Sequence, residues 1–179
     1  MAEVRDQLVD DHVTLGKILT ELQIALRRRD LQLAHDRLDL FWARLAVHIR
    51  AEHLHLFPAV LSRVENEAQK VVEQLRGDHD FFMHELARAV EVTRKLLTTS
   101  DESVIQQGLT VVRNSVLEIE QRLIKHNGVE ESQVYGWTTV VLSSEEQAKL
   151  AHKITAELEK RPPRFTDASW SHVDDVGAS

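Results

Sequence analysis

The stretch of sequence that decides the fold is HIRAEHLHLFP, residues 48–58. If this stretch is helical, the imidazole of His48 and the carboxylate of Glu52 project from one face, since positions four apart lie about one turn from each other. The pattern recurs in HNGVEESQVYG, residues 126–136, where His126 and Glu130 have the same spacing. An aliphatic residue, an aromatic residue and a helix breaker follow at equal offsets in both copies. The sequence therefore contains a repeated two-armed chelate.

Composition indicates a single, mostly helical domain. The 179 residues are 42% hydrophobic and 28% charged, with six glycines and three prolines, which is enough chain to bury a core without cross-links. The net charge of −7 argues against a nucleic acid or an anionic membrane as partner, because both are recognised through basic patches.

The sequence also limits the kind of metal site and the location. Cysteine is absent, so a metal ion would be held by nitrogen and oxygen ligands. No stretch approaches the ~20 apolar residues that span a bilayer, and the amino terminus lacks a basic segment followed by an apolar run. We therefore expect a cytoplasmic protein.

Apolar residues at helical spacing predict four long helices, at about residues 2–28, 31–57, 68–97 and from the N-cap Asp101 to Gly136. Pro58 is expected to end or kink the second helix, and Gly136 is expected to end the fourth. A capping box at Ser143 predicts a short fifth helix over residues 144–160. Residues 164–179 have no period and are expected to be extended, with Phe165 and Trp170 as anchors.

These elements predict an all-α fold, an antiparallel up-down-up-down four-helix bundle with a short fifth helix and an extended C-terminal tail. The bundle is expected to comprise residues 1–136. Residues 137–179 would form the short helix and an irregular tail packed on the bundle or on a partner chain. The sequence does not indicate an oligomeric state.

In such a bundle, four histidines fall on one layer. With the first turn near Asp30, His12 lies about eighteen residues before the turn and His48 about eighteen after it, so the two meet at one level. The midpoints between His48 and His79 and between His79 and His126 also fall close to predicted turns. The helix assignment rests on the aliphatic pattern and the helix breakers, so this agreement is independent support for the layer.

Glu52 and Glu130 lie one helical turn beyond this layer. Four neutral imidazoles and two carboxylates would be costly to bury unpaired, by several kcal/mol for the charges alone. Metal ions remove that cost, and two ions bridged by two carboxylates would use every one of the six side chains. Imidazole and carboxylate suit Fe, Mn or Zn. The predicted metal ligands are His12, His48, Glu52, His79, His126 and Glu130.

This ligand set in its H-x-x-x-E context resembles the hemerythrin-like, HHE cation-binding family over about residues 1–136. The resemblance implies two Fe ions in an oxo- or hydroxo-bridged di-iron centre that meets O₂, peroxide or NO. Oxygen-carrying members have a further histidine where this chain has Met83, and His84 is rotated off that face. The carrier-type spacing would select Glu131 in place of Glu130 as the last carboxylate.

The predicted function is binding of or reaction with O₂, peroxide or NO, or iron handling in oxidative or nitrosative stress. A reversible oxygen carrier and a non-catalytic sensor or interaction module stabilised by metal remain alternatives, so the sequence does not decide whether the protein is an enzyme. Tyr135 is interpreted as an anchor at the helix end, with a contact to the site as the alternative. His55 is interpreted as a solvated histidine at the end of the bundle, with a spare ligand or a proton relay as the alternatives.

Overall fold

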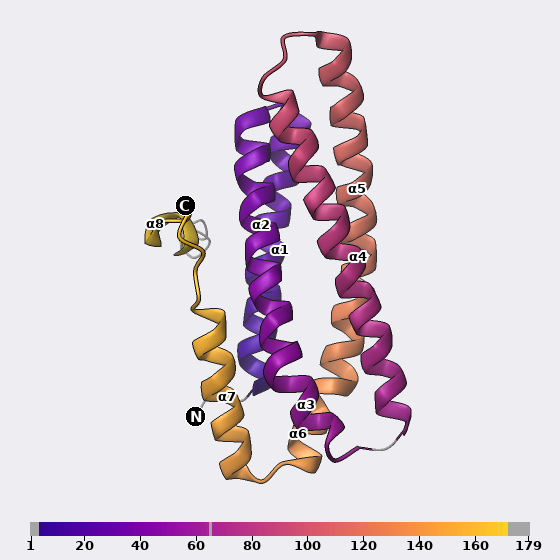
Figure 1. The fold of residues 1–179 in the computed structure, drawn as a ribbon, viewed down its shortest axis with the longest axis vertical. Helices are drawn as coiled ribbons and strands as arrows, with labels where there is room; N and C mark the ends of the chain where they lie inside the picture. The colour runs from indigo at the N-terminus through magenta and orange to yellow at the C-terminus, as the bar shows by residue number, and fades with distance from the viewer. Residues whose placement is uncertain (1–3, 65, 172–179) are drawn as a thin grey trace.

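The computed structural model describes residues 4–64 and 66–171, and all regular secondary structure in these residues is helical, which confirms the all-α prediction. The four longest helices are α1 (Val4–Arg28), α2 (Leu31–Ala51), α4 (Asn66–Leu96) and α5 (Glu102–Val129). They lie side by side as a helical bundle, with the α1–α2 and α4–α5 connections at one end (Figure 1). None of the helices described is long and apolar enough to cross a membrane.

The first reversal shows why the chain turns where it does. Arg29 adopts φ 58°, and the N–H groups of Arg29 and Asp30 bond back to the carbonyls of Leu26 and Ala25. This arrangement satisfies the last carbonyls of α1. The carboxylate of Asp30 then accepts a hydrogen bond from the Leu33 N–H and caps α2. A tight reversal therefore sets α1 and α2 side by side.

Of the two outcomes expected at Pro58, an end and a kink, the helix does not end there. The chain continues from α2 through a π-helical turn, η1 (Glu52–Leu56), into α3 (Phe57–Leu61). In the wider turn the Phe57 N–H bonds to the Glu52 carbonyl, five residues back. Pro58 then lies in the first turn of α3, where a missing N–H is tolerated.

The fourth predicted helix likewise does not end at Gly136. It continues through a second π-helical turn, η2 (Glu130–Val134), into α6 (Tyr135–Val141). Burial of Val134, Tyr135 and Thr138 outweighs the cost of about 1 kcal/mol that glycine imposes on a helix. The repeat seen in the sequence is thus a repeat of structure: each glutamate of the chelate begins a π turn.

The predicted fifth helix is present as α7 (Ser144–Leu158), with the capping box between Ser143 and Glu146 formed. It packs against α1, α2 and η1. The tail is not wholly extended as expected, because it includes the short helix α8 (Asp167–Ser171). Trp170 of α8 is buried against the bundle core. Residues 172–179 lie outside the described residues.

The hydrophobic core is divided into two clusters along the bundle. One cluster contains residues such as Leu15, Leu45 and Leu86, and the other contains Leu8, Leu56 and Val72. On α1, His12 falls between Leu8 of one cluster and Leu15 of the other. Each of the other three long helices also carries a histidine between residues of the two clusters, so a polar layer separates them.

Candidate metal centre

The polar layer brings together the six side chains that the sequence singled out. All six are buried, and both glutamates have no exposed surface. They form two groups of possible metal ligands in which the ligand atoms lie within 4.8 Å of one another. The first group is His12, His48 and Glu130, and the second is Glu52, His79, His126 and Glu130. Glu130 belongs to both groups.

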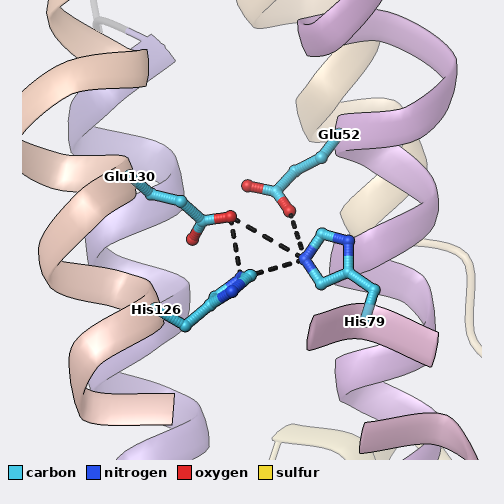
Figure 2. A group of neighbouring side chains, drawn as sticks. All are labelled: Glu52, His79, His126 and Glu130. Atoms are coloured by element: carbon cyan, nitrogen blue, oxygen red, sulfur yellow. Dashed lines mark hydrogen bonds and ion pairs between the residues drawn. The ribbon is translucent and has the colours of Figure 1, made fainter. Parts of the chain in front are cut away.

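Figure 2 shows the second group. The Nε2 atoms of His79 and His126 lie 3.0 Å apart. The Nε2 atom of His126 lies 2.9 Å from Oε1 of Glu130, and the Nε2 atom of His79 lies 3.4 Å from Oε2 of Glu52. Four potential ligand atoms from η1, α4, α5 and η2 thus face one point.

The first group faces the other oxygens of the same carboxylates. The Nε2 atom of His12 lies 3.3 Å from Oε2 of Glu130, and the Nε2 atom of His48 lies 3.5 Å from Oε1 of Glu52. Each carboxylate therefore turns one oxygen toward the His12–His48 pair and the other toward the His79–His126 pair. Both carboxylates therefore lie between the two pairs of histidines.

Three buried atoms of the layer have no hydrogen-bond partner within the part of the chain that the structure describes. They are Nε2 of His48, Oε2 of Glu52 and Oε1 of Glu130. Each unpartnered buried group of this kind costs about 1–3 kcal/mol, and more if it is charged. A metal ion bound to these atoms would remove the cost, so the residues fit a metal site.

The Nδ1 atoms of His48 and His126 are held by two aspartates that the sequence analysis did not assign. Nδ1 of His48 lies 2.8 Å from Oδ2 of Asp11, and Nδ1 of His126 lies 3.2 Å from Oδ2 of Asp78. A carboxylate accepts hydrogen bonds, so each ring donates its Nδ1–H. The neutral imidazole is then left with its Nε2 lone pair directed into the layer.

The other two imidazoles are held in a similar way. Nδ1 of His12 lies 2.8 Å from Oε1 of Glu131, and Nδ1 of His79 lies 2.9 Å from Nε2 of His53. The side chain of Glu131 is 37% exposed, whereas Glu130 is fully buried. The geometry therefore places Glu130 within the cluster and gives Glu131 the different task of orienting His12.

Two arginines complete the surroundings of the aspartates. Arg44 donates to Oδ1 of Asp11 at 3.0 Å, and Arg122 donates to Oδ1 of Asp78 at 2.7 Å. Each arginine stands four residues before the histidine of an H-x-x-x-E pair, and each aspartate directly precedes His12 or His79. These repeated positions are the signal in the sequence from which the supporting residues could have been found.

Tyr135 enters the site, so its interpretation as a helix-end anchor misses its position. Its hydroxyl lies 3.2 Å from a carboxylate oxygen of Glu52, 3.2 Å from one of Glu130 and 3.2 Å from Nε2 of His12. At the equivalent position of the repeat, the ring of Phe57 stacks on His79 with centroids 6.0 Å apart. Both aromatic rings are fully buried.

The two glutamates have opposite pKa shifts. Burial raises the pKa of Glu52, and the negative charge of Glu130 raises it further. Burial also opposes ionisation of Glu130, but the neighbouring His12 and His126 outweigh it and hold its pKa well below the usual range. Burial, together with both carboxylates, raises the pKa of Tyr135 well above its usual value, so the phenol keeps its proton.

The pKa values of the buried histidines are also shifted in opposite directions. Burial would lower the pKa of His48, but Glu52 and Asp11 raise it well above its ordinary value. Burial opposes protonation of His126 too, and the hydrogen bond and charge of Glu130 raise its pKa. Burial and the neighbouring His126 lower the pKa of His79 to about 2. Both His48 and His126 therefore bind a proton more strongly than free histidine does, and a metal ion would compete with protons for these rings.

The remaining histidines and the methionine named from the sequence lie elsewhere. The Nε2 atom of His55 lies 3.8 Å from a carboxylate oxygen of Glu157 on α7. His84 is exposed. Met83 lines a surface cavity of about 650 Å³ together with Trp42. The layer thus contains the four histidines predicted for it, and His53 supports one of them from outside.

The comparisons with known proteins agree with this geometry. The family model of the hemerythrin HHE cation binding domain matches residues 3–138, which include all six side chains of the layer. Neither the curated proteins nor the solved structures gave a match. A buried His/Glu cluster in a helical bundle is compatible with the metal binding that the family description states. The chain belongs to the hemerythrin family, as an HHE cation-binding domain.

Proposed function

We propose that this chain is a non-haem di-iron protein that binds or reacts with O₂, peroxide or NO, or handles iron under oxidative or nitrosative stress. The observation that carries the proposal is the position of the two glutamates, since each turns one oxygen toward each pair of histidines. His12 and His48 would hold one ion and His79 and His126 the other. Glu52 and Glu130 would serve both ions.

The fold proposed for this site is the antiparallel up-down-up-down bundle. Two observations support it: the α1–α2 and α4–α5 connections are short and lie at one end of the bundle, and α2 is followed by η1 and α3 at the other end (Figure 1). In this topology each H-x-x-x-E pair lies on a helix of one direction and each single histidine on a helix of the other. Di-iron carboxylate sites are built on facing helices in this manner.

Two iron ions held here would supply reversible redox chemistry and coordination positions for a small ligand. The chain's own contribution can be stated from its residues. Tyr135 holds a proton on its hydroxyl, 3.2 Å from both carboxylates. Phe57 and Phe82 cover His79 and His126, with Phe82 meeting His126 edge-on at 5.4 Å between centroids. These rings exclude bulk water, while the phenol provides a hydrogen-bond donor.

A surface cavity supports access by small molecules. It has a volume of about 390 Å³, lies on α4 and α5, and is lined by Asp78, Arg122, Lys125 and His126 among others. His126 is 3% exposed, so the cavity reaches the edge of the layer without opening it to bulk solvent. A diatomic molecule or peroxide matches this restricted route better than a larger substrate does.

The first test is the metal content of protein purified from iron-fed cells, with its near-ultraviolet and visible absorption. We expect about two irons per chain and the absorption of a bridged ferric pair. Less than one metal ion per chain, or zinc alone, would remove the di-iron proposal. The Glu131→Ala variant is the matched control for Glu130→Ala, because only the latter deletes a carboxylate that faces all four histidines.

The second test distinguishes a reactive di-iron site from an oxygen carrier and from a sensor or interaction module. Turnover of peroxide or NO by the iron-loaded protein is compared with that of Glu52→Ala, and we expect the variant to lose it. Equal rates would contradict a reactive di-iron site. Binding of O₂ that reverses when the gas is removed would identify an oxygen carrier. Metal-dependent stability without turnover or gas binding would identify a sensor or interaction module.

A further inference from the structure

The segment that follows α7, residues 159–171, lies outside the family match but contacts the bundle through Trp170. The indole is 9% exposed and belongs to the core cluster. The guanidinium of Arg44 lies over this ring, 5.0 Å from its centroid. Arg44 also donates a hydrogen bond of 3.0 Å to the main-chain carbonyl of Trp170. The segment therefore holds Arg44 from two sides.

Arg44 connects this contact to the metal layer. A second guanidinium nitrogen of Arg44 donates to Oδ1 of Asp11 at 3.0 Å, and Oδ2 of Asp11 accepts from Nδ1 of His48 at 2.8 Å. Arg44, Asp11 and His48 are each largely or fully buried. A continuous series of contacts thus runs from α8 to a side chain whose Nε2 has no hydrogen-bond partner in the described structure.

An equivalent series of contacts supports His126 in the other half of the site, with one difference. Arg122 lies over Phe81, 4.3 Å from the ring centroid, and donates to Asp78, which accepts from His126. Phe81 stands on α4, three residues after Asp78. One arginine therefore rests on an aromatic ring of the bundle itself, whereas the other rests on a ring supplied by the C-terminal segment.

We propose that Arg44 and Trp170 are positioning residues for His48, so that docking of residues 159–171 sets the metal affinity of the His12–His48–Glu130 group. This inference rests on the proposed function. The planar guanidinium is held in one orientation by the Trp170 ring and carbonyl, and it fixes the carboxylate that orients the imidazole. Loss of outer contacts of this kind typically weakens metal binding by about 10–100-fold.

The coupling acts in both directions. If docking of the segment strengthens binding at one group, metal bound at that group strengthens docking by the same factor, because the two equilibria share one free energy of coupling. The Glu52–His79–His126 group is supported by Phe81 and is not expected to share this dependence. The two metal ions would thus be held with different sensitivity to the C-terminal segment.

The test uses the full chain, made metal-free and titrated with Zn²⁺, followed by release of Zn²⁺ to a colorimetric chelator. In Trp170→Ala we expect one of the two ions to be released about 10–100-fold faster, with the other unchanged. Phe81→Ala should accelerate release of the other ion. Arg44→Lys keeps the charge but lacks the planar fork, and it should reproduce Trp170→Ala. Trp137→Ala, at a half-buried tryptophan of α6, is the control.

A second readout requires no metal. The Nδ1–H proton of His48, hydrogen-bonded to Asp11, should give a protected downfield proton resonance in the metal-free protein, identified by its loss in His48→Gln. Faster solvent exchange of this proton in Trp170→Ala and Arg44→Lys supports the proposal. The proposal would be overturned if both variants released their two Zn²⁺ ions as slowly as wild type and if the exchange of the His48 Nδ1–H proton were unchanged in both. If wild-type protein binds no Zn²⁺, the proposed function fails, while the resonance still tests the link to Trp170.

Discussion

The Nε2 atoms of His79 and His126 lie 3.0 Å apart in the buried layer. His126 donates its Nδ1–H to Asp78, so in the neutral ring its Nε2 carries a lone pair. A hydrogen bond at this distance requires one of the two Nε2 atoms to carry a proton. A cation bound to both rings needs both lone pairs, and this requirement makes the site dependent on pH.

The first prediction follows from these protons. The pKa values of His48 and His126 are raised by the surrounding carboxylates after opposition from burial, so both rings bind protons more strongly than free histidine does. Zn²⁺ binding is therefore expected to release protons and to strengthen as pH rises from 6 toward 8. Calorimetric titration in two buffers of different ionisation enthalpy measures the release. A heat that is independent of the buffer would contradict the prediction.

The second prediction separates the two adjacent glutamates of η2. Glu130→Gln removes a charge that faces both pairs of histidines, so we expect loss of both bound ions. Glu131→Ala removes the acceptor for His12 Nδ1 at 2.8 Å, and we expect two ions that are held about 10–100-fold more weakly at one group. Metal content after gel filtration distinguishes the variants. Equal loss of metal in both would show that Glu131 is itself a ligand.

The third prediction concerns Tyr135. Its replacement by phenylalanine deprives the carboxylates of Glu52 and Glu130 of a buried donor, which should cost about 1–3 kcal/mol of stability in the metal-free protein. The loss should be smaller when Zn²⁺ is bound, because the ions then satisfy the oxygens. Urea unfolding of both forms measures the difference, with Trp137→Phe as control. An equal loss in the two forms would place the phenol outside the metal's surroundings.

The fourth prediction is a pH dependence of folding stability due to His79. Burial and His126 lower its folded pKa to about 2, so below pH 6.5 the unfolded chain binds a proton that the folded chain does not. Stability is therefore lost as pH falls through 6.5, and the loss reaches about 2 kcal/mol at pH 5. The free energy of unfolding of metal-free protein is measured between pH 7.5 and pH 5, for wild type and His79→Gln.

The variant isolates His79 because His48 and His126 act with the opposite sign. Their raised pKa values stabilise the folded state in acid, and this contribution is lost as pH rises through those values. Wild type and His79→Gln share both contributions, so the stability advantage of wild type should shrink toward pH 5. An advantage that stays constant across the range would show that folding does not lower the pKa of His79.

The sequence was sufficient for the helical fold and for the level of the four histidines. Aliphatic spacing placed the long helices, and equal distances from the turns at Asp30 and Asp101 brought histidines of different helices to one height. These features depend on regular helical geometry, which sequence periodicity reports directly. The structure then places His12, His48, His79 and His126 within one buried layer.

Features that depart from regular geometry could not be predicted in this way. Tyr135 lies five residues after Glu130, which on an α-helix is about 140° away from it. The π turn joins the Tyr135 N–H to the Glu130 carbonyl and returns the phenol to the same face. The contacts of Asp11 and Asp78 with the histidines span 37 and 48 residues. They form only when two helices pack in a particular register.

The two π turns place a phenylalanine and a tyrosine at equivalent positions beside the layer. The two halves of the site repeat one another in histidine, glutamate, aspartate and arginine, but Phe57 presents only hydrocarbon where Tyr135 presents an oxygen. This one atom gives the cluster a polarity: a bound molecule with two unlike ends would meet a hydrogen-bond donor at one end and a ring face at the other. The aromatic residue five positions after each glutamate therefore makes the two halves of the site chemically unlike.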